Sequence, residues 1–251
     1  MATMENIVKF DSRPVLKDPI FISALPGIGN VGKIAGDHFS EILKAEKFAS
    51  IYSMNYPPQV IPDENNVVKM ACNELWYART PAGQDLIILR GDYQGSSAEG
   101  QFILAEDIME ILVSYGTKQI VTLGGYGVGR IIKDRHVFGA VTRIELKEDL
   151  EKAGVTFNPG EPKNGIVGAA GLFLGLGQIN GIDAFCLMGE TSGFFADPGS
   201  AICILNVLGK LFGVEDLQLT ALEEENSKIE DLTNKATEQQ KSDDTHLGYI
   251  G

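Results

Sequence analysis

The feature that most constrains the fold is an apolar run that leads into a glycine-rich turn and then into an amphipathic segment. Residues 19–25 (PIFISAL) carry no charge, which is the pattern of a strand buried on both faces of a sheet. The turn at residues 27–32 contains three glycines, and apolar residues then recur at helical spacing over residues 31–45. A buried strand, a tight turn and a helix in this order predict one unit of a parallel sheet.

Similar strand and helix patterns alternate over most of the chain. This alternation predicts an α/β fold, a doubly wound and mostly parallel sheet with helices on both faces. Capping residues mark two helix starts, Ser96 with Glu99 and Asp197 with Pro198. Further strands are expected at residues 48–54, 85–89, 119–123, 138–144 and 182–188, and helices at residues 98–115, 165–177 and 198–213.

One part of the predicted sheet lacks helical connections. Strand patterns at residues 67–72 and 74–79 follow each other without a helix, so we expect these two strands to pair and part of the sheet to be antiparallel. Residues 1–18 show no regular pattern and are interpreted as an irregular lead-in.

The composition changes after Gly213, which divides the chain into two parts. We interpret residues 1–214 as the α/β core domain. Residues 215–244 contain ten acids, three lysines and no aromatic residue, which favours an exposed or loosely docked acidic helix. Residues 237–246 are expected to be disordered. The last five residues are apolar again, so residues 215–251 are interpreted as an acidic helical extension with a flexible C-terminal tail.

Charge and cysteine usage exclude several classes of protein. A net charge of −13 disfavours binding to nucleic acid or to an anionic membrane. No apolar run reaches the roughly 18–20 residues of a membrane span, and the N-terminus lacks the core of a signal peptide. Cys72, Cys186 and Cys203 are scattered, which is typical of reduced thiols rather than of disulfides or a zinc site. We therefore expect a cytoplasmic protein without a metal.

The turn Gly27-Ile28-Gly29-Asn30-Val31-Gly32 matches the glycine fingerprint of dinucleotide-binding proteins. That fingerprint requires an acid about 20 residues later to hold the ribose. The second predicted strand ends instead at Asn55. We therefore favour a structural tight turn, in which Gly27 and Gly29 serve backbone conformation and close packing, over a nucleotide site, and we expect no cofactor.

Four loops follow predicted strands at one edge of the sheet, where α/β proteins bind ligands. Side chains from these loops are candidates for one crevice, in which Arg130 and glycine amides would hold an anion and Glu190 a hydroxyl group. The alternative is that the loops are turns whose polar groups are satisfied locally. The candidate crevice residues are Gly27, Gly29, Asp92, Gln94, Tyr126, Arg130 and Glu190.

The sequence shows no catalytic signature. His38, His136 and His246 have no partners at metal-ligand spacing. A nucleophile elbow, a Walker loop and a cysteine–histidine signature are all missing from the sequence. These observations favour a protein that is not an enzyme.

Four motifs in fixed order resemble a known family. They are PGIGNVG at residues 26–32, GDYQ at residues 91–94, LGGYG at residues 123–127 and GET at residues 189–191. Together they resemble the archaeal branch of the proteasome assembly chaperone family, the type related to the second eukaryotic assembly chaperone. The resemblance covers roughly residues 15–215. It implies an α/β fold similar to purine nucleoside phosphorylases without their catalytic residues, homo-oligomers of about three to five subunits, and binding to proteasome α-subunits or the core particle.

Members of that family often end in a hydrophobic-Tyr-any tripeptide that enters pockets between α-subunits. This chain ends in a similar but shifted segment, because Tyr249 is third from last and Gly248 precedes it. The residues expected to bind the partner are Leu247, Tyr249, Ile250 and Gly251.

Three functional hypotheses remain at this point. The leading one is a non-enzymatic chaperone or adaptor for proteasome assembly. The second is an enzyme or binding protein for a nucleoside-like or small anionic ligand in the crevice at the strand ends. The third is an oligomeric protein whose partner is unrelated to the proteasome.

Overall fold

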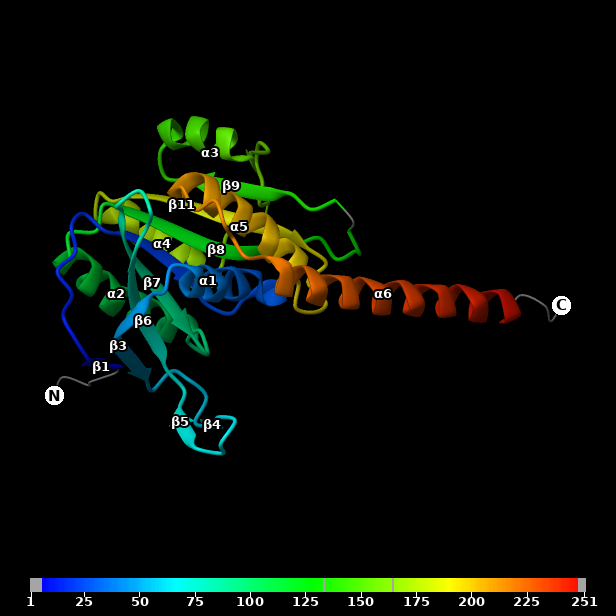
Figure 1. Cartoon of the computed structure of the whole chain (residues 1–251), viewed down its shortest axis with the longest axis horizontal. Helices are drawn as coiled ribbons and strands as arrows, with labels where there is room; N and C mark the ends of the chain where they lie inside the picture. Colours follow the sequence, from blue (N-terminus) through cyan, green and yellow to red (C-terminus); the bar gives the residue numbers. More distant parts are fainter. Residues whose placement is uncertain (1–5, 133, 164, 248–251) are drawn as a thin grey trace.

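The computed structural model describes residues 6–132, 134–163 and 165–247, with side chains of the last segment described as far as residue 233. The described residues form an α/β body from which one long helix projects (Figure 1). The strands are β1 (Asn6–Phe10), β2 (Ile20–Ala24), β3 (Glu46–Ser53), β4 (Val60–Pro62), β5 (Val68–Met70), β6 (Asn73–Arg79), β7 (Asp85–Gly91), β8 (Gln119–Gly127), β9 (Val137–Val141), β10 (Val155–Thr156) and β11 (Asp183–Thr191). The helices are α1 (Val31–Ile42), α2 (Ala98–Ser114), α3 (Lys147–Ala153), α4 (Gly168–Ile179), α5 (Pro198–Phe212) and α6 (Thr220–Leu247), with short 3-10 turns η1 (Ile28–Asn30) and η2 (Ile144–Leu146).

Nine of the described strands form one sheet in the order β1-β3-β6-β7-β2-β8-β11-β9-β10. Its centre, β7-β2-β8-β11, is parallel. Strands β6, β3 and β1 continue one side as antiparallel neighbours, and β9 runs antiparallel to β11 on the other side. The predicted α/β class and the antiparallel part of the sheet are confirmed. The likeness to purine nucleoside phosphorylases stays a prediction.

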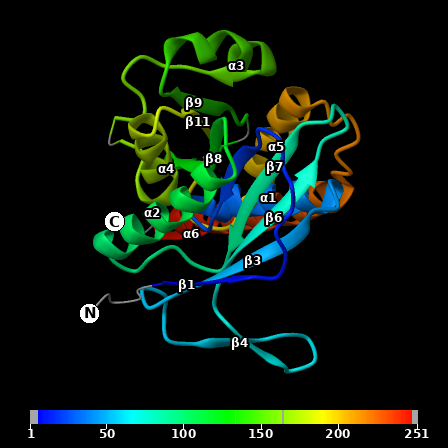
Figure 2. The same ribbon diagram turned by 90° about the vertical axis from the view of Figure 1, so that its left-hand side faces the viewer.

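Helices cover both faces of the sheet, which explains the uninterrupted apolar strands. In β2, Ile22 and Ala24 pack with α1, α3 and α5, whereas Phe21 and the following Leu25 pack with α2 and α4. Figure 2 shows α2 and α4 on one side of the sheet and α1 and α5 on the other. Each face therefore has its own hydrophobic core, and the sheet separates the two.

Helices α2 and α5 each begin with a side-chain cap of the residue type that the sequence predicts. Asp197 caps α5, since its Oδ1 accepts a hydrogen bond from the Ser200 N–H at 3.0 Å. In α2 the cap is Ser97 and not Ser96, because the Ser97 Oγ accepts from the Gly100 N–H at 3.0 Å. The capping pattern in the sequence thus predicts α2 correctly but places its capping residue one position too early.

Two expectations about the strands are wrong. Residues 6–10 are not irregular, because β1 pairs with β3 at the edge of the sheet. Residues 67–72 do not pair with residues 74–79 either. Strand β5 pairs with β4, while β6 joins the main sheet between β3 and β7. Closeness along the chain favours residues 67–72 as the partner of residues 74–79, but a strand can pair with any strand that the fold brings beside it.

The β4–β5 hairpin stands away from the body (Figure 1). Its register places Val60 opposite Met70 and Pro62 opposite Val68, so these four side chains share one face. Val60, Val68 and Met70 are each more than half exposed, at 55%, 60% and 62%. The hairpin therefore presents an apolar face that no described residue covers.

The expectation of disorder at residues 237–246 is also wrong, because α6 continues to Leu247. The stretch contains Glu238, Gln239, Gln240 and Lys241 in a row, and these residue types have high helix propensity. The helix packs on the body near its start, where Leu222 joins the core between α5 and the sheet. Beyond that region it projects outward (Figure 1). Among the described residues, no helix is both long and apolar enough to cross a membrane.

Candidate functional site

A cavity of about 840 Å³ lies at the carboxyl ends of the central parallel strands. The loops after β7 and β2, the end of β8 and the start of α4 all contribute to its walls. The helices that follow β2 and precede β11 lie on opposite faces, with α1 on one and α4 on the other. Such a switch point is where open α/β sheets bind ligands, and the volume lies in the range of small-molecule sites.

A fixed carboxylate lines the cavity. The Tyr126 hydroxyl donates a hydrogen bond to the Glu161 Oε2 at 2.6 Å, and the Lys163 Nζ lies 3.8 Å from the Glu161 Oε1. The hydrogen bond from Tyr126 lowers the pKa of Glu161, and the same bond raises the pKa of Tyr126. Glu161 is therefore ionised at neutral pH, and Tyr126 holds its orientation. The Tyr126 ring in turn packs edge-on against Phe138, with centroids 5.1 Å apart.

Gln94 joins two walls of the cavity. Its amide Nε2 donates to the Pro26 carbonyl at 2.6 Å, and its Oε1 accepts from the Ala169 N–H at 2.9 Å. The first turn of α4 is thus tied to the loop after β2. A Cβ at Gly168 would lie 2.5 Å from the same Oε1, so only glycine fits beside this bridge. The polar ends of Gln94 are therefore used within the protein.

The floor of the cavity is apolar and contains one thiol. Leu25, Leu123 and Met188 line it together with Cys186. Burial raises the pKa of the Cys186 thiol to about 12, so it stays protonated at neutral pH. The three cysteines are free, and no group of three or more His, Cys, Asp or Glu among the described residues could hold a metal ion.

The structure brings together some of the candidate crevice residues and not others. Gly27, Gln94 and Tyr126 line the cavity. Gly29 and Asp92 do not line it, and the Asp92 Oδ2 accepts a hydrogen bond from the Cys72 N–H at 3.3 Å. Arg130 is exposed outside the cavity, so the cation expected to hold an anion does not line this space.

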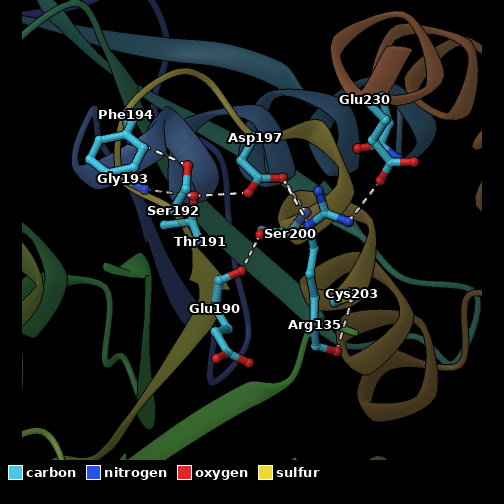
Figure 3. Close-up of polar contacts among 11 residues, drawn as sticks. Arg135, Glu190, Thr191, Ser192, Gly193, Phe194, Asp197, Ser200, Cys203 and Glu230 are labelled. Atoms are coloured by element: carbon cyan, nitrogen blue, oxygen red, sulfur yellow. Dashed lines mark hydrogen bonds and ion pairs between the residues drawn. The ribbon is translucent and has the colours of Figure 1, made fainter. Parts of the chain in front are cut away.

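Glu190 does not line the cavity either, although its side chain lies on the same face of β11 as those of Cys186 and Met188, which do. The main chain of Glu190 joins a buried polar network at the start of α5 (Figure 3). The Glu190 Oε2 lies 3.1 Å from the His136 Nδ1, and its main-chain oxygen accepts a hydrogen bond from the Ser200 hydroxyl. The buried Asp197 accepts from the Thr191 hydroxyl at 2.8 Å and lies 3.2 Å from the Arg135 Nε. The side chains of Thr191, Asp197 and Ser200 are thus hydrogen-bonded within this loop and to the main chain, which is the local alternative for the β11–α5 loop.

In the glycine turn, Gly29 is required for close packing, whereas Gly27 has room for a side chain. Gly29 has a φ of 62°, and a Cβ there would lie 2.8 Å from the Thr191 Oγ1. Gly27 is extended, and the nearest atom to a Cβ would be the Gln94 Nε2 at an ordinary 3.9 Å. In this turn, the absence of a side chain matters most at Gly32, because a Cβ there would lie 2.4 Å from the Leu123 carbonyl oxygen. Close contact between α1 and β8 accounts for this glycine without a ligand.

Sequence reasoning missed Glu161 and Lys163. They lie on the loop between β10 and α4, which follows a two-residue strand at the end of the sheet and carries no strand-end signal. The expected partner-binding residues Tyr249, Ile250 and Gly251 lie outside the described residues, and Leu247 is the last residue of α6.

A sequence profile of the PAC2 family matches residues 21–237, which span the sheet from β2 onward, both helix layers and the first part of α6. The chain belongs to the PAC2 family. This membership confirms the resemblance drawn from the four motifs. Two uncharacterized proteins of Methanocaldococcus jannaschii are similar to this PAC2 chain. One is 36% identical over 263 residues, covering 99% of this chain and 100% of the relative. The other is 30% identical over 242 residues, covering 94% and 93%.

Solved PAC2-like structures from Pyrococcus furiosus share the fold. PbaB, described as an archaeal proteasome activator, is 37% identical to this chain, with a TM-score of 0.86 and coverage of 94% of this chain and 100% of PbaB. PbaA, described as an archaeal homolog of proteasome-assembly chaperone, is 23% identical, with a TM-score of 0.76 and coverage of 97% and 96%. The likeness to PbaA shows the fold alone.

Proposed function

We propose that this protein is a non-enzymatic proteasome assembly chaperone or activator that binds the proteasome core particle or its α-subunits. The observation that carries the proposal is its likeness to PbaB, a proteasome activator, at 37% identity over nearly the whole length of both chains. The missing catalytic signatures and the protonated Cys186 thiol agree with a binding role.

The architecture of α6 supports a mode of binding through residues 247–251. The helix contains 28 residues and ends at Leu247. The 14 positions from residue 234 to residue 247 rise by about 21 Å at 1.5 Å per residue. They carry the start of the apolar segment away from the α/β body (Figure 1). The described end of α6 lies apart from the sheet and the other helices, which supports binding through the residues that follow it.

The interaction is expected to depend on Tyr249. One aromatic ring buries a large area at small entropic cost, so Tyr249→Ala should weaken binding by about 2 kcal/mol, or roughly thirtyfold in Kd. Deleting residues 247–251 should weaken it at least as much. The acidic run before the segment should speed association with a basic surface, so the association rate should fall as salt rises. Binding is measured by biolayer interferometry on an immobilised archaeal core particle, together with peptide hydrolysis by that particle.

His246→Ala is the matched control, because it alters the neighbouring residue and leaves the apolar segment intact. Circular dichroism and light scattering must show an unchanged fold and mass for each variant. If the full chain does not bind the core particle, the proposed function is wrong. If the truncated chain binds as tightly as the full chain, the function stands and the folded body carries the interaction.

A further inference from the structure

The cavity at the strand ends plays no part in binding through residues 247–251, yet it is built as a site. It combines a volume of about 840 Å³ with an apolar floor and a carboxylate held in place by Tyr126. The loop that carries Glu161 also supplies Ile166 and Val167 to its wall. Val167 is 76% exposed and Ile28 on the facing loop is 47% exposed, so two apolar side chains border an open cavity. An occupant with an apolar body would cover both.

The charges around the cavity determine which ligands fit. Glu161 is ionised, and Lys163 is the only cationic side chain among the described residues that line the cavity. The Lys163 side chain is 81% exposed and lies 3.8 Å from the carboxylate, so water screens this pair and Lys163 is free to move away. The first turn of α4 offers little to an anion, because Gln94 already accepts from the Ala169 N–H. Arg130 is absent from the lining.

We infer that this cavity binds a neutral or singly cationic small molecule with an aromatic or aliphatic body and an amino or hydroxyl group that donates to Glu161. The apolar body lies against Leu25, Ala169 and Met188, and the donor group takes the Glu161 Oε1 in place of Lys163. An anionic group would instead meet a carboxylate with one exposed lysine beside it. This inference goes beyond the proposed function and replaces the anionic ligand considered from the sequence alone.

Three probes with one body and different charge test the inference on the full-length protein. Phenethylamine, 2-phenylethanol and 3-phenylpropionate share a phenylethyl body and end in an ammonium, a hydroxyl and a carboxylate group. Saturation-transfer NMR and isothermal titration should give the order phenethylamine, phenylethanol, phenylpropionate from tightest to weakest. Glu161→Gln removes the charge and keeps an oxygen for Tyr126. It should weaken phenethylamine by about tenfold and leave phenylethanol nearly unchanged.

A second variant tests the location. Gly124 lines the cavity, and a Cβ there would meet no atom within 4 Å, so Gly124→Val should fill the space without disturbing the strand. It should abolish binding of phenethylamine and phenylethanol. Gly175→Val is the matched control, because Gly175 on α4 also has open space and lies outside the cavity. Glu64→Gln, on the exposed turn of the β4–β5 hairpin, is the control for loss of a carboxylate.

The inference is overturned if the propionate binds most tightly, if no probe binds at millimolar concentration, or if Gly124→Val leaves binding intact. If the Glu161→Gln variant still binds the ammonium probe most tightly and the carboxylate probe most weakly, the role of Glu161 is overturned. Core-particle binding by the same variants is measured in parallel. Because the proposed function rests on the likeness to PbaB and not on the cavity, a failed ligand test leaves it standing.

Discussion

At the scale of single residues, Gly29 and Thr191 show how a motif typical of nucleotide binding serves packing in this chain. The Gly29 carbonyl accepts from the Asp197 N–H at 2.9 Å, and its α-carbon lies against the Thr191 side chain. Thr191 in turn donates to Asp197 at 2.8 Å. The loop after β2 is therefore locked to the loop after β11, and the space that a phosphate would need beside Gly29 is occupied by a threonine.

Replacing Gly29 should cost stability, whereas replacing Gly27 should not. Gly29→Ala forces a side chain into a left-handed conformation and against the Thr191 hydroxyl, so we expect about 1–3 kcal/mol of destabilisation. Gly27→Ala, at an extended position with room for a Cβ, should change stability by less than about 0.5 kcal/mol. Urea denaturation followed by circular dichroism gives both values. Equal destabilisation by the two variants would contradict this account, and a thermal shift with NAD, FAD or ATP that Gly29→Ala removes would restore the nucleotide hypothesis.

At the scale of elements, the start of α5 is a junction on which α6 also rests. Asp197 caps α5 and pairs with Arg135, whose side chain is only 12% exposed. Arg135 also forms an ion pair with Glu230 on α6, in which the Arg135 Nη1 lies 3.1 Å from the Glu230 Oε1 (Figure 3). A buried guanidinium thus links the cap of one helix to the flank of the next.

Asp197 and Glu230, the two carboxylates at this junction, should differ sharply in their contribution to the free energy of unfolding. Asp197→Ala removes the cap and leaves Arg135 buried with one half-exposed partner, so we expect about 3–5 kcal/mol of destabilisation. Glu230→Ala should cost less than about 1 kcal/mol, because the Glu230 side chain is 48% exposed and its ion pair is screened. Chemical denaturation checks the two values. A larger loss in Glu230→Ala than in Asp197→Ala would show that the docking of α6, and not the cap of α5, dominates here.

The sequence predicted those elements whose signals are local, and missed arrangements that depend on distant partners. Asp197 with Pro198 identifies the start of α5, and the apolar run before Pro26 identifies a central strand. The pairing of β5 with β4, by contrast, depends on β4, which lies outside the predicted set. In the candidate site, Gln94 follows the central strand β7, Tyr126 lies at the end of β8, and both were found, whereas Glu161 reaches the cavity from a loop at the far edge. A strand-end rule does not identify a residue that folds back from another part of the chain.

At the scale of the whole molecule, a homo-oligomer of about three to five subunits stays a prediction from the family resemblance. Gly168, Gly171 and Gly175 in α4 are positions where a missing side chain lets another segment approach closely. Gly168 and Gly171 pack against Gln94 and the Ile166 carbonyl of the same chain, and Gly175 alone is open. The apolar face of the β4–β5 hairpin is a separate surface that stays uncovered in a single chain.

Multi-angle light scattering at micromolar concentration should give a mass about three to five times that of one chain. Because the oligomer contacts are expected on the folded body, deletion of residues 247–251 should leave this mass unchanged. A monomeric mass for the full chain would contradict the prediction. A mass that falls only in the truncated chain would instead assign the terminal segment to self-association.

The projecting helix also has a hydrodynamic consequence. A compact chain of this length has a radius of gyration of about 18 Å, whereas a helix of 28 residues is about 42 Å long. The first part of α6 rests on the body through Leu222 and Glu230, so the projecting part is residues 234–247, about 21 Å long. A rod of this length on a compact body raises the frictional ratio and slows both translational and rotational diffusion. Each subunit should therefore have a Stokes radius larger than that of a sphere of equal mass, and a gel-filtration column calibrated with compact standards would overestimate the number of subunits.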